Sequence, residues 1–177
     1  TIPEGLTVEQ IWSRIAASDV LVGDMPKTIP PEGALLADTQ RFSRGTTRTD
    51  IVEKLIADQK KLIEEIWARR APDLPVKTVE EFVTLASIVE KETGLADERS
   101  RVAAVFVNRL NKGMRLQSDP TILYGLFGGK GRPADRPIFK SDLETPTPYN
   151  TYTIDGLPPT PIANPGRAAL EAVANPS

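Results

Sequence analysis

The chain has 177 residues, of which 40% are hydrophobic, and its formal net charge is −2, so it can bury a core in one ordinary domain and long-range disorder is not expected. Its basic residues form no block, which argues against nucleic acid as the main partner. It contains neither histidine nor cysteine, which excludes disulfides, histidine-dependent nucleophilic catalysis and the usual zinc sites, and leaves acid–base chemistry to Asp, Glu, Lys or Tyr.

The first part of the chain predicts two helices separated by a loop. Thr7 and Gln10 have the spacing of a capping box, and apolar residues follow at helical spacing. Residues 30–46 are rich in turn-forming residues and predict a loop. Asp50 is suited to cap a second helix, whose apolar stripe ends near Arg70.

The middle of the chain predicts a helix over residues 79–93 that carries two carboxylates. Thr78 and Glu81 form another capping box at its start, and Gly94 is suited to end it. The sequence LASIVEKETG, residues 85–94, makes this helix strongly apolar.

The second half of the chain predicts shorter elements. Asp97 is placed to cap a fourth helix, which Gly113 ends, and Asp119 before a proline reads as the cap of a short fifth helix. Residues 128–163 predict loops and short strands, and Asn164 with the next proline opens a last short helix. We therefore expect an α+β fold dominated by helices, with a loop-rich, proline-rich C-terminal part.

The two carboxylates, Glu90 and Glu92, are candidates for acid–base chemistry. At about 100° per residue they point roughly 160° apart, each near one edge of the apolar stripe. One of them is expected to be half-buried, and burial raises a carboxyl pKa as a glycosidase general acid requires. An ordinary amphipathic helix with flanking glutamates explains the same pattern, and periodicity does not choose between the two residues.

Two polar stretches, residues 106–125 and 145–166, supply candidate substrate contacts. Their amides, hydroxyls, carboxylate and tyrosine rings are of the kind that line a saccharide groove. The candidates are Asn108, Gln117, Ser118, Asp119, Tyr149, Asn150 and Tyr152. The alternatives are a helix cap at Asp119 and, for the second stretch, a surface loop held extended by its prolines.

Three segments, LASIVEKET, VFVNRLNKGMRLQSDPT and LETPTPYNTYTIDGLPPTPIANPG, together with TIPEGLTVEQI near the start, resemble the YceG-like endolytic murein transglycosylase family over most of the chain. The resemblance implies cleavage of the β-1,4 bond between N-acetylmuramic acid and N-acetylglucosamine within peptidoglycan glycan strands, leaving 1,6-anhydro ends. It also implies that Glu92, the second glutamate of EKE, is the single catalytic acid/base. No metal and no cofactor are implied.

The resemblance has two departures. EGALLADTQRF stands where the family usually has an EG-x-LFPDTY-like segment, which affects contacts near Asp38. The family's usual final strand and helix, LysM-like subdomain and N-terminal anchor have no counterpart in this sequence. We therefore expect an N-terminal helical part, residues 1–75, and a catalytic core truncated at its C-terminus, residues 76–177, within one continuous domain.

The family further implies an extracytoplasmic location, attachment to the inner membrane only through an anchor outside this sequence, and peptidoglycan synthases as partners. Two other functions fit the same residues. A two-carboxylate hydrolase would use Glu92 with Asp119 or Glu90 and would produce reducing ends. A non-catalytic glycan-binding module would use Tyr149 and its neighbours and would survive loss of Glu92.

Overall fold

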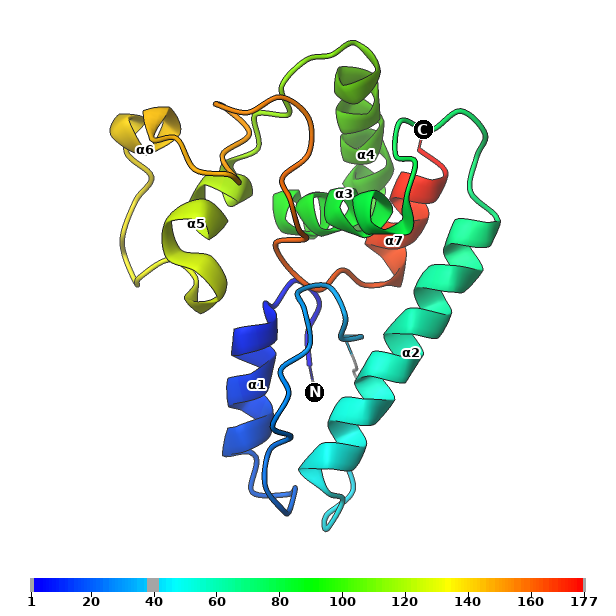
Figure 1. Cartoon of the computed structure of the whole chain (residues 1–177), viewed down its shortest axis with the longest axis vertical. Helices are drawn as coiled ribbons and strands as arrows, with labels where there is room; N and C mark the ends of the chain where they lie inside the picture. Colours follow the sequence, from blue (N-terminus) through cyan, green and yellow to red (C-terminus); the bar gives the residue numbers. More distant parts are fainter. Residues whose placement is uncertain (1, 38–41, 177) are drawn as a thin grey trace.

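A computed structural model describes residues 2–37 and 42–176, and these residues are mainly helical, as expected (Figure 1). The helices are α1 (Val8–Ala17), α2 (Arg48–Ala68), α3 (Val79–Glu92), α4 (Ala96–Asn111), α5 (Asp119–Phe127), the 3-10 turn η1 (Gly128–Lys130), α6 (Lys140–Glu144) and α7 (Arg167–Ala174). Within the described ranges, β structure is limited to isolated bridge residues, among them the parallel bridge between Val22 and Thr47. The short strands expected in residues 128–163 are replaced by η1, α6 and loops, which corrects the β part of the prediction.

Threonine side chains fix the beginnings of the first three helices. Both predicted capping boxes, at Thr7 and Thr78, are confirmed. Helix α2 begins earlier than expected because Thr47, and not Asp50, is its cap: the Thr47 hydroxyl accepts from the Asp50 N–H at 3.1 Å. Asp50 lies instead in the first turn, where its negative charge interacts favourably with the positive end of the helix dipole.

The turn between α3 and α4 also differs from the sequence-based expectation. Helix α3 ends in the extended residue Thr93 without a left-handed glycine at Gly94. The Thr93 hydroxyl accepts from the N–H of Leu95, which occupies the N-cap position of α4, so Asp97 lies in the first turn and is not the cap. At the other end of α4, Gly113 adopts φ +70° and ends the helix as expected.

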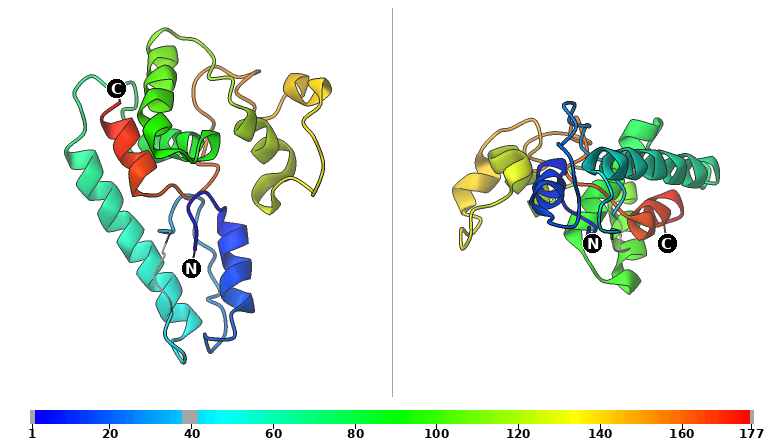
Figure 2. Two further views of the ribbon diagram at one scale, coloured as in Figure 1. Left: turned by 180° about the vertical axis from the view of Figure 1, so that it is seen from behind. Right: turned by 90° about the horizontal axis from the view of Figure 1, so that it is seen from below.

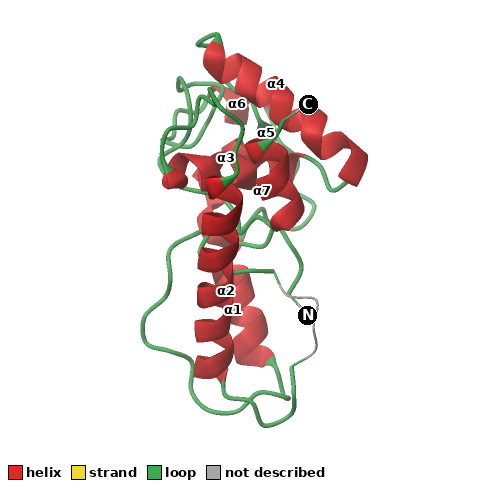
Figure 3. Cartoon of the chain, turned by 90° about the vertical axis from the view of Figure 1, so that its right-hand side faces the viewer, coloured by secondary structure: helices red, strands yellow, loops and turns green. Residues whose placement is uncertain are grey.

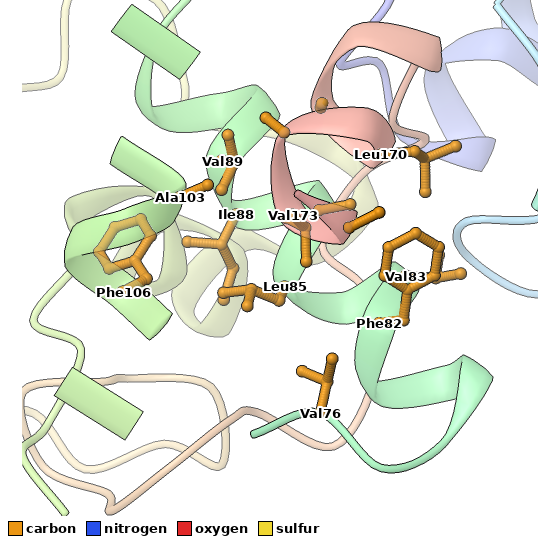
Figure 4. Close-up of a cluster of buried hydrophobic side chains, with 14 of the residues drawn as sticks. Val76, Phe82, Val83, Leu85, Ile88, Val89, Ala103, Phe106, Leu170 and Val173 are labelled. Carbon is orange, nitrogen blue, oxygen red and sulfur yellow. The ribbon is translucent and has the colours of Figure 1, made fainter. Parts of the chain in front are cut away.

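The buried apolar side chains form two clusters. The smaller one joins α1 to the first half of α2 through residues such as Ile11 and Leu55. The larger one joins the second half of α2 to α3, α4 and α7, and Figure 4 shows Ile88, Phe106 and Val173 meeting within it. Figure 3 shows α1 and the adjoining part of α2 projecting from the body that the other helices form. No described helix is long and apolar enough to span a bilayer.

A polar junction lies between the two clusters. Gln59, halfway along α2, is fully buried, and its Nε2 donates to the carbonyl oxygens of Gly33 and Pro165 at 3.1 and 3.2 Å. The side-chain oxygen of Asn164 accepts from the N–H groups of Gly33 and Leu35 at 3.0 and 3.1 Å. Buried backbone groups that no helix satisfies are paired here, so the junction fixes the loop around Gly33 against the C-terminal loop.

The expected division at residues 75 and 76 falls between α2 and α3. The larger cluster crosses this boundary, because Leu62, Ile63 and Ile66 of α2 pack with α3 and α7. The division into these two parts of one domain stays a prediction.

Candidate active site

The two glutamates at the end of α3 lie in different surroundings. Glu90 is only 9% exposed; its Oε1 accepts from the Gly166 N–H at 2.8 Å, and its Oε2 lies 3.7 Å from the Arg99 guanidinium. Burial raises the pKa of Glu90, and the Gly166 hydrogen bond and the Arg99 charge only partly oppose this. Glu92, the last residue of α3, is exposed. The buried carboxyl expected from the sequence is therefore Glu90, whose oxygens already have partners.

Glu92 is oriented by a serine at the start of α5. The Ser118 hydroxyl donates to Glu92 Oε2 at 2.8 Å. Ser118 is itself fully buried, and its N–H donates to the Thr151 hydroxyl at 2.8 Å, which pairs with the Thr121 hydroxyl at 2.8 Å. Among the described residues no hydrogen bond engages Glu92 Oε1. One carboxylate oxygen is held and the other is open to a ligand.

Asp119 and Tyr152 form a second pair beside Glu92. The Tyr152 hydroxyl donates to Asp119 Oδ1 at 2.7 Å. Desolvation, the bond to Asp119 and the negative charges of Asp119 and Glu92 raise the pKa of Tyr152 to about 12, so its hydroxyl remains a donor at neutral pH. Asp119 is the first residue of α5 and Ser118 occupies the N-cap position, so the helix-cap alternative for Asp119 is wrong. Its carboxylate holds Tyr152 instead.

The turn before Ser118 is strained. Gln117 adopts φ +53°, a left-handed conformation that costs a non-glycine residue about 1–2 kcal/mol. Its N–H donates to the Thr151 carbonyl at 3.2 Å, and the Arg109 guanidinium donates to the carbonyl of Leu116, so both neighbours hold the turn in place. The exposed Gln117 side chain makes no hydrogen bond to the described residues and projects from the turn that positions Ser118.

Thr151 is the residue that sequence reasoning missed. It lies between two predicted residues, Asn150 and Tyr152, yet it makes the contact that fixes Ser118. Figures 1 and 2 show the loop after α6, which carries these residues, running between the α5–α6 pair and the body formed by α3 and α4. The position of Thr151 inside the candidate stretch was the only signal available in the sequence.

Asn150 has a different role from the predicted one. Its Nδ2 donates to the carbonyl oxygens of Leu143 and Thr145, both at 2.9 Å, and its Oδ1 accepts from the Tyr152 N–H at 2.9 Å. The side chain is 1% exposed. Asn150 therefore shapes its own loop and has no amide group directed at a ligand, which corrects its assignment as a sugar contact.

Tyr149 lines a hollow near the middle and start of α3, away from the end that carries Glu92. This hollow has a volume of about 510 Å³, is mostly apolar, and is also lined by Val83 and Thr84. The Tyr149 ring meets the Tyr124 ring edge-on, with centroids 4.9 Å apart. The structure thus brings Tyr152, and not Tyr149, to Glu92. Asn108 is exposed on α4, and its side chain makes no hydrogen bond to the described residues.

Two further expectations concern Asp38 and metal ions. Asp38 lies outside the described residues. In the described ranges no group of three or more acidic residues could hold a metal ion. The arrangement at Glu92 is suited to proton exchange with a ligand, because an exposed carboxyl is oriented through one oxygen and left open at the other.

Three comparisons relate the chain to known proteins. The model of the YceG-like family matches residues 1–177. The chain is 38% identical over 148 residues to an endolytic murein transglycosylase of Bacillus subtilis, covering 83% of the chain and 39% of that relative. It is 33% identical over 147 residues to one from Streptococcus pneumoniae, covering 81% of the chain and 26% of that relative. It spans well under half the length of both.

A solved structure is also similar. A crystal structure of a yceG-like protein from Listeria monocytogenes superimposes with a TM-score of 0.75 at 30% sequence identity. The match covers 99% of this chain and 65% of that one.

Proposed function

The chain belongs to the YceG-like family, and we propose that it is the catalytic part of an endolytic murein transglycosylase with Glu92 as its single acid/base. The substrate is the peptidoglycan glycan strand, and the bond cleaved is the β-1,4 bond from N-acetylmuramic acid to N-acetylglucosamine. One observation supports Glu92 above all others: it is exposed at the end of a buried helix, with one oxygen fixed by Ser118 and the other open.

The reaction needs only one carboxyl group. Protonated Glu92 gives its proton to the glycosidic oxygen as the bond to C1 of muramic acid breaks. The resulting carboxylate then takes the proton of the C6 hydroxyl of the same sugar, whose oxygen bonds to C1. The 1,6-anhydro ring closes, Glu92 returns to its protonated form, and no water is consumed.

Ser118 and Tyr152 act as positioning residues in this scheme. The Ser118 hydrogen bond holds the carboxyl group in one orientation, and the buried threonine pair holds Ser118. Tyr152 donates its one hydroxyl proton to Asp119, which fixes the tyrosine side chain near the reacting carboxyl group. Side chains that are held in place before the substrate binds lose less conformational freedom when it does.

A two-carboxylate hydrolase is the second candidate, because Glu92 contacts Ser118, the chain neighbour of Asp119, which also carries a carboxylate. Such an enzyme would add water at C1 and leave reducing ends. Glu90 does not fit the second role, since Gly166 and Arg99 engage its oxygens inside the junction.

Mass spectrometry of purified glycan strands treated with the protein tests the proposal. A transglycosylase yields anhydro ends that are one water lighter than the reducing ends of a hydrolase. We expect anhydro products from the native protein and about 1000-fold fewer from Glu92→Gln. Reducing ends would favour the hydrolase, and strands bound but never cut would favour a glycan-binding module.

The location and the partners belong to the same proposal. Peptidoglycan lies outside the cytoplasmic membrane, so the chain acts on that side, attached through an anchor outside this sequence. The peptidoglycan synthases make the glycan strands that this chain would cut. These synthases are therefore its expected partners. Cell fractionation and co-purification of the tagged full-length protein would test both statements.

A further inference from the structure

A hollow of about 390 Å³ lies between the start of α1, the end of α3 and α5. Lys91 and Pro120 are among its lining residues, and they adjoin Glu92 and Asp119 along the chain. In Figures 1 and 2 the end of α5 lies next to the beginning of α1, where Thr7 donates to the Gly129 carbonyl. Two of the lining residues are thus the chain neighbours of candidate active-site residues, although Glu92 and Asp119 do not themselves line the hollow.

Three hydrogen-bond donors line this hollow without a protein acceptor among the described residues: Lys91, Arg132 and the amide nitrogen of Gln10. The Gln10 orientation is fixed, because its Oε1 accepts from the Thr7 N–H at 3.0 Å and its Nε2 is left as the free end. Gly131 allows this arrangement: it adopts φ +81°, and a Cβ there would lie 2.9 Å from Gln10 Nε2.

No acidic side chain lines the hollow to balance these donors. Glu90, the residue before Lys91 on α3, is buried and engaged by Gly166 and Arg99; burial raises its pKa, and the Lys91 charge opposes this only in part. Glu9, on α1, lines a separate hollow. Unpaired cations with an oriented amide donor favour an anionic ligand, and a guanidinium suits a carboxylate in particular.

We propose that Lys91, Arg132 and Gln10 form a subsite for a carboxylate carried by the muramic acid residue of the glycan strand. The inference rests on the proposed function for its substrate. Muramic acid bears a lactyl ether at C3, whose carboxylate is free in strands without peptides and is replaced by the carboxylates of the peptide stem in strands that keep them.

The subsite determines which bond is cut. A peptidoglycan strand alternates two sugars through β-1,4 bonds, and only muramic acid carries a carboxylate. A cationic hollow beside Glu92 anchors that sugar and so places one of the two kinds of bond at the carboxyl group. Specificity for the bond from muramic acid to glucosamine then follows from the charge of muramic acid. The N-acetyl groups of the two sugars are alike, so the site does not need to tell them apart.

The test measures binding separately from cleavage. In a Glu92→Gln background, which leaves strands intact, the affinity for three strands is compared: stem-bearing, stem-free with free lactyl carboxylates, and stem-free with methyl-esterified carboxylates. Adding Lys91→Gln and Arg132→Gln should weaken binding of a carboxylate strand about tenfold, or about 1.4 kcal/mol, and leave the esterified strand unchanged. The carboxylate strand that loses affinity identifies the source of the anion.

A matched control removes the same charge elsewhere. Lys112→Gln with Lys140→Gln changes two exposed lysines that do not line the hollow, and it should leave all three affinities unchanged. The subsite is overturned if the double variant and its parent bind both carboxylate strands with equal affinity. It is also overturned if the two substitutions weaken binding of the esterified strand as much as binding of the carboxylate strands. If the native protein produces no anhydro ends but the charge-dependent binding persists, the proposed function fails while the subsite stands.

Discussion

Glu90 and Glu92 are two residues apart on α3 but belong to two different regions, the buried polar junction and the exposed candidate active site. Glu90 faces the polar junction, where it binds the backbone of a distant segment at Gly166 and where burial raises its pKa. Glu92 faces α5, exposed and held through only one oxygen. A raised carboxyl pKa is often taken to mark a functional site. Here the raised pKa belongs to Glu90, which holds segments of the chain together. Glu92 is distinguished instead by its exposed position and its open carboxylate oxygen.

The largest expected effect is at Glu92. Glu92→Gln should lower strand cleavage about 1000-fold, since general acid–base catalysis contributes about 10²–10⁴-fold, and should leave thermal melting unchanged because the side chain is exposed. Glu90→Gln is the matched control, and its cleavage rate should stay within about tenfold of native, or about 1.4 kcal/mol. Equal losses in both variants would erase the distinction between the two regions. Glycan digestion followed by product analysis measures both.

The next largest effect is expected in the junction. Asn164→Ala removes the acceptor of the buried Gly33 and Leu35 N–H groups, and an unsatisfied buried group costs about 1–3 kcal/mol. We expect the free energy of unfolding to fall by about 3 kcal/mol in chemical denaturation. Asn108→Ala, on the exposed face of α4, should change it by less than about 0.5 kcal/mol. Similar values for the two variants would show that the junction does not carry stability.

A smaller effect is expected at Tyr152. Tyr152→Phe removes the donor to Asp119 but keeps the ring, and should lower kcat about threefold to tenfold, about 0.7–1.4 kcal/mol, with little change in KM. A positioning role predicts this split, while a purely structural role predicts parallel losses of activity and melting temperature. Tyr149→Phe, in the separate apolar hollow, is the control and should leave kcat unchanged.

The smallest effect concerns pH. Burial raises the pKa values of Glu32 and Glu90 above the ordinary value of 4.5. In the window above 4.5 and up to these raised values the folded state holds more protons than the unfolded state, so their contribution to stability is present at lower pH and is lost as pH rises. Asp142 and Glu171, whose pKa values are lowered, act in the opposite sense as pH falls.

The difference between native protein and Glu90→Gln isolates this effect, because Gln does not titrate. Melting temperatures measured from pH 4 upward, on the order of half a pH unit apart, should show the native protein losing stability relative to the variant through the window. A difference that is constant with pH would contradict the burial of an ionisable Glu90.

The sequence predicts local features of this fold better than remote ones. The capping boxes at Thr7 and Thr78 involve residues three positions apart, and both are confirmed. The surroundings of Glu90 could not be predicted, because its partner Gly166 lies 76 residues further along the chain. Helical spacing places both glutamates at edges of the apolar stripe, and only the packing of α7 and its preceding loop decides which edge is covered.

The candidate site shows the same limit. Asp119 before a proline is a common helix start, yet Tyr152 competes for its carboxylate and Ser118 takes the cap position. Asn150 was predicted to contact sugar because its residue type suits that role, but carbonyl groups of its own loop satisfy it. The assignment of Glu92 came from family resemblance and stays a prediction.

Helix α2 has a consequence for how the molecule unfolds. The apolar side chains of its first half pack in the smaller cluster and those of its second half in the larger one. Gln59 is buried between the two halves. Losing either cluster would expose apolar side chains along one half of a continuous 21-residue helix and break the Gln59 contacts that serve both. We therefore expect the two clusters to unfold as a single cooperative unit, and hydrogen exchange should give amides on both halves of α2 the same opening free energy.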